Sequence, residues 1–111
     1  MVSFQKMGEL IKTARSFAGI MNDEKISNDA DIVKTLFPEI DKLYQAQKEL
    51  KPLIESLDNY TERVVLSLRY LKGYGYPWIV EKVSMSRASV FNYLKSGKQK
   101  LIEKYPDRIM P

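Results

Sequence analysis

The chain has 111 residues, a hydrophobic fraction of 44% and a formal net charge of +4, which indicate one small globular domain and argue against disorder. It contains no cysteine and no histidine, so disulfides, thiolate metal sites and the commonest general base are excluded. No paired-carboxylate, phosphate-loop or nucleophile motif is present, and we therefore expect no enzyme, no metal site and no cofactor.

No apolar run approaches the ~20 residues that span a bilayer, and the first residues lack the uninterrupted apolar core of a signal peptide. We therefore expect a cytoplasmic protein without membrane contact. Charge is unevenly distributed: residues 1–59 hold 8 Lys/Arg against 10 Asp/Glu, and residues 60–104 hold 9 against 3. A positive second half favours an anionic partner such as nucleic acid, although a solvated helical surface explains the charge equally well.

Apolar residues at alternating three- and four-residue steps predict a first helix over Phe4–Met21. The polar segment that follows predicts a loop near residues 22–29, in which Asn28 and Asp29 are expected to cap a short helix. Pro38 is expected to end this helix, because proline disfavours helical geometry in the residue before it and suits the first turn of the next helix.

The next predicted helix carries an apolar seam in four-three spacing, in which only one residue is polar. The seam consists of Leu36, Ile40, Leu43, Gln47, Leu50, Ile54 and Leu57. It either packs against the first helix or pairs with a second copy of the chain, which would give a homodimer. Pro52 complicates both interpretations, because a proline inside a helix bends it or marks the start of a separate helix. Residues 1–56 are thus predicted to form a helical region for packing or dimerisation.

Asn59 is expected to cap the following helix, with Glu62 as its capping-box partner, and Gly73 is expected to end it. The predicted buried residues of this helix are Val64, Val65, Leu68 and Leu71. After a short loop, a further helix begins at Pro77 or Trp78. With no convincing strand, the chain is predicted to be all-α, a helical bundle.

The last two predicted helices are joined by a tight turn around Ser84, and Ser86 is a good cap for the second of them. The apolar residues expected to hold the pair together are Ile79, Val83, Met85 and Val90. Two residues depart from the usual pattern of such a unit. Val80 replaces a common alanine, and Ser84 replaces a common glycine, which adopts positive φ more readily.

Residues 57–101 resemble region 4 of bacterial sigma factors. The residues typical of that region occur here in the same order and without a gap. The resemblance is closer to the region-4-like domains of small phage regulators of the ArpU and RinA type. The residues that carry it are Arg63, Val65-Leu66, Leu68-Arg69-Tyr70, Gly73, Tyr76, Ile79-Val80, Val83, Ser86, Val90, Leu94 and Lys100-Leu101. It implies a DNA-binding helix-turn-helix domain over residues 57–104, followed by a tail over 105–111. The implied function is sequence-specific transcriptional regulation of phage or prophage genes in a bacterial host cell.

By this resemblance, the helix from about Ser86 to Leu101 is the recognition helix that enters the major groove. The residues expected on its DNA-facing side are Ser86, Arg87, Ser89, Phe91, Asn92, Lys95, Lys98 and Lys100. An arginine such as Arg87 suits guanine or phosphate, and Asn92 suits adenine. The lysines would anchor the phosphate backbone and make affinity depend on salt.

These residues also have simpler interpretations. Lysines late in a helix interact favourably with the helix dipole, and packing against the preceding helix is an equally simple role for Phe91. Arg69 and Lys72 are further candidates for phosphate contact, although Arg63 and Arg69 are also expected to pair with carboxylates of the domain.

Two other functions remain open at this point. The departures at Val80 and Ser84 favour a protein-interaction module that binds RNA polymerase or another protein without DNA. A DNA-packaging recognition subunit would bind DNA as a ring of copies.

Overall fold

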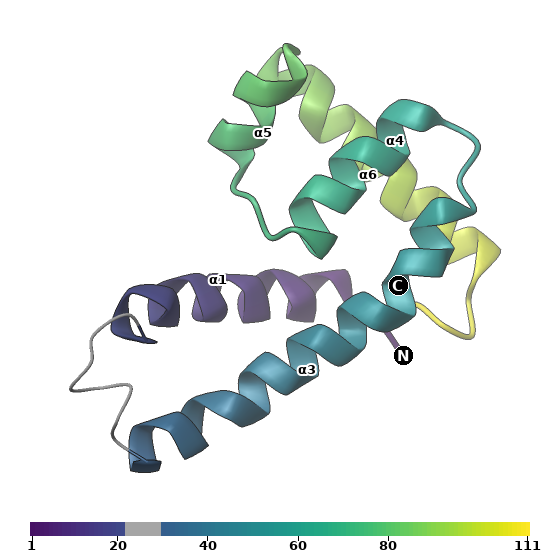
Figure 1. Ribbon diagram of the computed structural model, residues 1–111. Helices are drawn as coiled ribbons and strands as arrows, with labels where there is room; N and C mark the ends of the chain where they lie inside the picture. Colours follow the sequence, from purple (N-terminus) through teal and green to yellow (C-terminus); the bar gives the residue numbers. More distant parts are fainter. Residues whose placement is uncertain (22–29) are drawn as a thin grey trace.

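The computed structural model describes the backbone of residues 1–21 and 30–111, and the side chains of residues 1–16, 35 and 37–111. Within these residues it contains five α-helices and no strand beyond an isolated bridge, which confirms the all-α prediction (Figure 1). The helices are α1 (Phe4–Met21), α3 (Ala30–Glu55), α4 (Tyr60–Leu66), α5 (Tyr76–Val83) and α6 (Arg87–Lys104). The loop and cap predicted at residues 22–29 lie outside the described residues.

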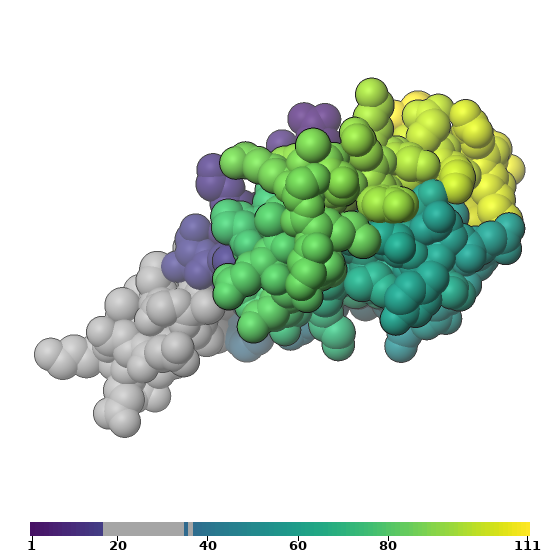
Figure 2. Space-filling model, turned by 90° about the horizontal axis from the view of Figure 1, so that it is seen from above, coloured from purple at the N-terminus to yellow at the C-terminus, as the bar shows by residue number. Residues whose placement is uncertain are grey.

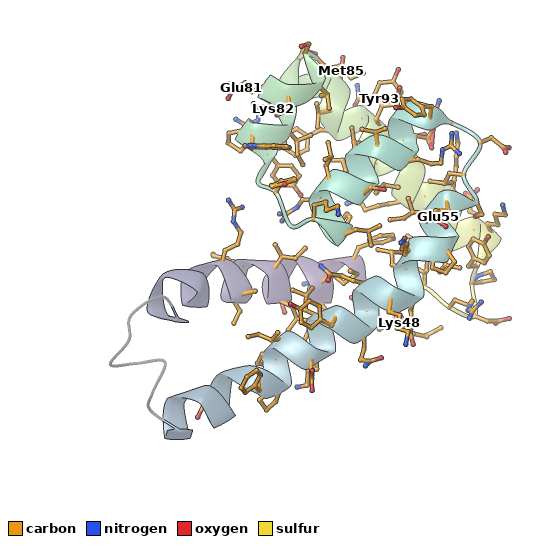
Figure 3. The ribbon with its side chains drawn as sticks, in the orientation of Figure 1. Lys48, Glu55, Glu81, Lys82, Met85 and Tyr93 are labelled. Carbon is orange, nitrogen blue, oxygen red and sulfur yellow. The ribbon has the colours of Figure 1, made fainter. Side chains whose placement is uncertain are left out.

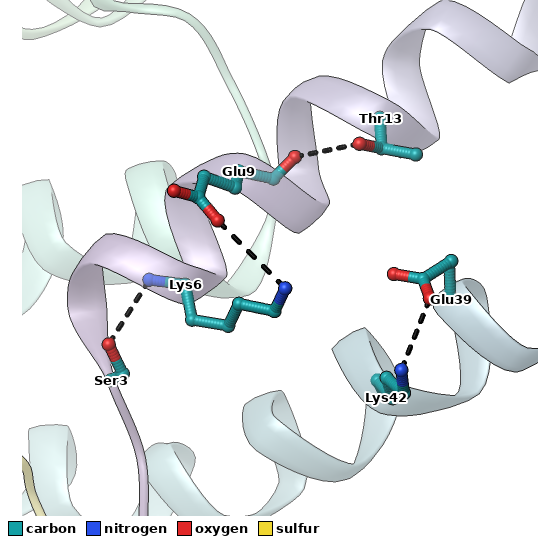
Figure 4. A network of polar contacts seen from close by, with 6 residues as sticks. All are labelled: Ser3, Lys6, Glu9, Thr13, Glu39 and Lys42. Carbon is teal, nitrogen blue, oxygen red and sulfur yellow. Dashed lines mark hydrogen bonds and ion pairs between the residues drawn. The ribbon is translucent and has the colours of Figure 1, made fainter.

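Helices α1 and α3 run in opposite directions and pack together as one layer, with α4, α5 and α6 above them (Figure 1). Helix α1 has the predicted bounds, and the Ser3 hydroxyl caps it by accepting from the Lys6 N–H at 3.1 Å. The ion pairs of this layer, Lys6–Glu9 and Lys42–Glu39, are exposed and each lies within one helix (Figure 4). Such exposed pairs contribute little, so burial of apolar side chains holds the layer together.

Helix α3 continues from Ala30 to Glu55 through both Pro38 and Pro52. The helix end predicted at Pro38, and the boundary considered at Pro52, are therefore wrong. Both prolines are exposed, so water can solvate the carbonyl that each leaves without an N–H partner. The packing of the helix against α1 and the following helix outweighs the local preference of proline.

The apolar seam of α3 packs into the core of its own chain. Leu43, Leu50, Ile54 and Leu57 are all buried in the common core, as the intramolecular interpretation predicted. These residues are not free to pair with a second copy, so a homodimer would need another surface. The polar seam residue Gln47 is half-buried, and its Nε2 donates to the Tyr70 carbonyl at 3.1 Å.

Helix α4 begins at the predicted cap, because the Asn59 side chain accepts from the Glu62 N–H at 2.9 Å. It continues as a π-helical turn over Ser67–Leu71 and ends at Gly73, whose φ is 73°. The Tyr74 N–H then donates to the Leu68 carbonyl at 3.0 Å, which satisfies one of the carbonyls left free at the helix end.

The buried residues of this segment differ in part from the predicted ones. Leu66 and Tyr70 are almost fully buried together with the predicted Val65, whereas the predicted Val64, Leu68 and Leu71 are half-buried. Burial raises the pKa of Tyr70 to about 12.

The two ends of the chain pair with each other (Figure 1). The Val2 N–H donates to the Arg108 carbonyl, and the Met110 N–H donates to the Val2 carbonyl, both at 2.8 Å. Ile109 is fully buried in the same core as the helices. Residues 105–111, predicted as a tail, are thus part of the packed structure. No helix in the described part of the chain has both the length and the apolar character needed to cross a bilayer.

Candidate nucleic-acid interface

Helices α5 and α6 form a compact pair joined by three residues, 84–86. Helix α5 begins at Tyr76, one residue before the predicted start, with Gly75 as its cap. Ile79 of α5 and Val90 of α6 are fully buried, and the predicted Val83 and Met85 are half-buried between the helices. The apolar residues chosen from the sequence therefore do hold this pair together.

Ser84 makes the turn in the left-handed conformation, with φ 53° and ψ 41°, and it is the only non-glycine residue with positive φ in the described chain. This is the position where glycine is usual. An L-residue with a side chain costs about 1 kcal/mol in this conformation. Ser86 then caps α6, because its Oγ accepts from the Ser89 N–H at 3.1 Å.

Replacing Ser84 with glycine is expected to raise the free energy of unfolding by about 0.5–1 kcal/mol, since glycine removes the strain of the left-handed turn but adds freedom to the unfolded chain. Urea denaturation followed by circular dichroism measures the change. Lys95→Gly, at an exposed position within α6, is the control and should lower stability by about 0.7 kcal/mol. A loss of stability in Ser84→Gly would contradict the assigned turn.

The outer face of α6 presents Arg87, Asn92 and Lys95, all three exposed. The side chains of Asn92 and Lys95 form no hydrogen bond or ion pair with any described residue, although both carry strong donors. Figure 2 shows α5 (green) and the first part of α6 (yellow-green) exposed together on one side of the molecule. The structure thus leaves polar and cationic groups on this face free for a ligand.

Phe91 lies on the flank of α6 that faces α5, and its ring contacts the Tyr76 ring at a centroid distance of 4.8 Å. The Arg87 guanidinium lies 5.5 Å above Phe91, and the Arg69 guanidinium lies 4.5 Å above Tyr76. We call these four side chains, Arg69–Tyr76–Phe91–Arg87, the cation–aromatic ladder. It shows that Phe91 is in part a packing residue. Arg69 forms no ion pair with a described carboxylate, so the expected pairing is wrong.

Three other predicted residues lie at the edge of the outer face of α6. The Ser86 hydroxyl donates to the Ser89 hydroxyl at 2.9 Å, so both side chains already serve the start of the helix. Ser89 and Lys98 are half-buried. They are therefore less accessible to a ligand than Arg87 or Asn92.

Lys100 is exposed, but its ammonium forms an ion pair that the sequence did not predict. Its Nζ lies 2.6 Å from Oε1 of Glu62, which is only 2% exposed, and the same oxygen accepts from the Ser96 hydroxyl. Helices α4 and α6 cross closely here, because Gly97 of α6 lies against Leu66 of α4. Lys100 thus joins two helices, and its predicted place on the DNA-facing side stays a prediction. The Glu62 side chain likewise forms this ion pair instead of the second half of a capping box.

A cationic cleft of about 540 Å³ lies between α1 and the segment that leads into α5. Lys12 and Arg15 of α1 line it from one side, and Arg69 and Tyr76 line it from the other. Sequence reasoning missed the two α1 residues, because that helix was interpreted only through its apolar stripe. The charge pattern on its polar side was visible, but nothing in the sequence placed it beside residues 69–77.

A family model matches residues 24–102, which is most of the chain and includes the whole segment from α3 to the last turns of α6. The chain belongs to the DUF1492 family. That family is described as a protein of unknown function. Searches among curated proteins and among solved structures gave no match.

Only part of the cationic cleft is formed by residues within the DUF1492 match. Arg69, Gly75 and Tyr76 lie within the matched residues, whereas Lys12 and Arg15 precede them. The outer face of α6 lies entirely within the DUF1492 segment.

Proposed function

We propose that the chain is a sequence-specific DNA-binding transcriptional regulator of phage or prophage genes that acts in the cytoplasm of a bacterial cell. In this proposal α5, the turn at Ser84 and α6 form a helix-turn-helix, and the first half of α6 enters the major groove. The observation that carries it is the outer face of α6, where Arg87, Asn92 and Lys95 are exposed on a helix held rigidly by buried residues.

Each exposed group suits a different part of DNA. Arg87 begins α6, where a guanidinium can donate two hydrogen bonds to guanine. Asn92 lies five residues later on the outer face, and its amide can both donate to and accept from adenine. Lys95, one turn further, suits a phosphate, which positions the helix without reading sequence. Lys98 is a second cation at the edge of this face.

Selection of tight-binding duplexes from a randomised pool tests this proposal, and it is expected to yield a consensus. Arg87→Ala and Asn92→Ala should each weaken binding to that consensus about 10- to 100-fold and relax the preference at one base, because each removes a base contact of about 1–3 kcal/mol. Fluorescence anisotropy titrations measure both effects.

Lys48→Ala is the matched control for charge, because Lys48 is exposed on α3 and lies at the other end of the molecule from Lys82 and Met85 (Figure 3). It should bind the consensus within about twofold of the parent, as expected for a charge distant from the DNA and screened by salt. The absence of a consensus, or equal binding by the Arg87 and Asn92 variants, would refute sequence-specific recognition.

A protein partner, such as RNA polymerase, is the second candidate. It is favoured by the exposed stack of Tyr74 and Trp78, whose rings are 3.8 Å apart with the Lys82 ammonium beside Trp78. Exposed aromatic residues are enriched in protein interfaces. Capture of a partner that persists after nuclease digestion, in a protein that binds no duplex, would favour this candidate over DNA recognition.

A further inference from the structure

We propose that the cationic cleft between α1 and the start of α5 binds a phosphate of the DNA backbone, beside the groove contact of α6. This inference rests on the DNA-binding function proposed above and adds a second contact region to it. Its residues on α1, Lys12 and Arg15, belong to a part of the chain to which no DNA contact has been assigned.

The charges of the cleft are unbalanced. Lys12, Arg15 and Arg69 line it, and no carboxylate is among the described residues that do so. None of the three cations forms an ion pair with a described residue. The Nε of Arg69 is in addition buried without a hydrogen-bond partner. Three uncompensated cations around one hollow favour an anion with several acceptor oxygens, and phosphate is such an anion.

The backbone at Gly75 brings the Arg15 guanidinium to the entrance of α5. A Cβ built on Gly75 would lie 2.8 Å from Nη1 of Arg15, so the close approach depends on the absence of a side chain there. Gly75 is also the cap of α5, and it has no side chain to satisfy the first N–H groups of that helix. The first turn of α5 therefore has no side-chain cap where the Arg15 guanidinium approaches it.

The cation–aromatic ladder connects this cleft with the proposed reading face. Tyr76 lines the cleft and also contacts Phe91 of α6, over which Arg87 lies. Arg69 and Arg87 are thus the two ends of one packed series of side chains. A ligand that spans both ends must be long and repeatedly anionic, which a duplex is and a single nucleotide is not.

The variants for the test are chosen to leave the fold intact. Lys12→Ala/Arg15→Ala removes the α1 cations, and Gly75→Ala displaces Arg15 through the added Cβ while its φ of −74° remains open to alanine. Arg69 is left unchanged because it donates to the Tyr74 carbonyl and packs in the ladder. Lys48→Ala/Lys51→Ala removes the same charge from exposed positions of α3 and is the control.

Anisotropy titrations against one duplex over a range of salt concentrations provide the measurement. Each phosphate contact contributes about 0.9 to the slope of log Kd against log salt. Because the cleft holds one phosphate, we expect the slope to fall by about 1 in Lys12→Ala/Arg15→Ala and by up to about 1 in Gly75→Ala. Binding at low salt should weaken about tenfold, with an unchanged base preference. The control should keep the parental slope.

The outcomes separate this inference from the proposed function. If the parent binds duplex and the cleft variants keep its slope, the cleft inference is overturned while DNA recognition stands. If the parent binds no duplex, the proposed function fails and the backbone contact fails with it. In that case, inorganic pyrophosphate is titrated into ¹⁵N-labelled protein to ask whether the cleft binds a phosphate compound other than DNA. A shift of the Gly75 amide signal that Lys12→Ala/Arg15→Ala abolishes would assign the cleft to a soluble phosphate compound.

Discussion

Replacing Gly97 with valine is expected to lower the free energy of unfolding by about 3 kcal/mol. Gly97 is buried where α6 crosses α4, and a Cβ at this position would lie 2.7 Å from Leu66 Cδ1 and 3.3 Å from Glu62 Cβ. Leu66 is itself fully buried, so the two helices would have to separate to admit a branched side chain. Chemical denaturation of the purified variant measures the loss.

Gly8→Val is the matched control, because a Cβ there meets only the end of the Arg69 side chain at 3.9 Å. Since valine is a better helix former than glycine, this variant should be as stable as the parent or slightly more stable. Gly97→Ala should lie between the two, with the overlap partly offset by the gain in helix propensity. Equal stability of Gly97→Val and Gly8→Val would show that α4 and α6 do not approach closely at this point.

Lys100→Ala is expected to destabilise the fold by about 2–3 kcal/mol, although it replaces a surface lysine. Its ammonium is the charged partner of a carboxylate that is 3% exposed. Removing it leaves Glu62 with the Ser96 hydroxyl as its remaining donor, since Glu62 Oε2 already has none. This expected destabilisation lies at or below the lower end of the range for breaking a buried ion pair, because the Lys100 side chain is 53% exposed.

The double variant Glu62→Met/Lys100→Met removes both charges, so it shows whether the destabilisation in Lys100→Ala comes from leaving the Glu62 carboxylate unpaired. It should recover to within about 1 kcal/mol of the parent, because buried ion pairs often yield to apolar residues at little cost. The Asn59 cap is retained in it, since that bond uses the Glu62 backbone N–H. If Lys100→Ala instead keeps parental stability and lowers the salt slope of DNA binding, Lys100 is a phosphate contact after all.

Local sequence rules predicted the elements that local interactions determine. The bounds of α1, the Asn59 cap, the end at Gly73 and the turn that leads to Ser86 all follow from neighbouring residues. The same rules failed at Pro38, where tertiary packing carries the helix through a residue that disfavours it. The π turn at Ser67–Leu71 was not predicted either, and Tyr70 within it is buried although the predicted Leu68 and Leu71 are only half-buried.

In the candidate site, too, the features set by neighbouring residues were predictable and those set by tertiary packing were not. The exposure of Arg87, Asn92 and Lys95 follows from helical spacing next to a buried stripe, which a sequence displays. The ion pair of Lys100 was not predictable, because its partner, Glu62, lies 38 residues away in the sequence. The cleft depends on α1 lying beside residues 69–77, and the two segments share no sequence pattern. For the close approach of α4 and α6, the sequence did offer one signal, Gly97, since a glycine inside a helix often marks close packing.

The π turn at Ser67–Leu71 has a consequence for how related chains compare. Its Lys72 N–H bonds back five residues to the Ser67 carbonyl, so the turn contains one residue more than an α-helical turn. Deleting a single residue there would let the helix close regularly, and everything after it would rotate by about 100° about the helix axis. A one-residue gap at this place in an alignment would therefore identify relatives in which α5 is aimed differently over α1.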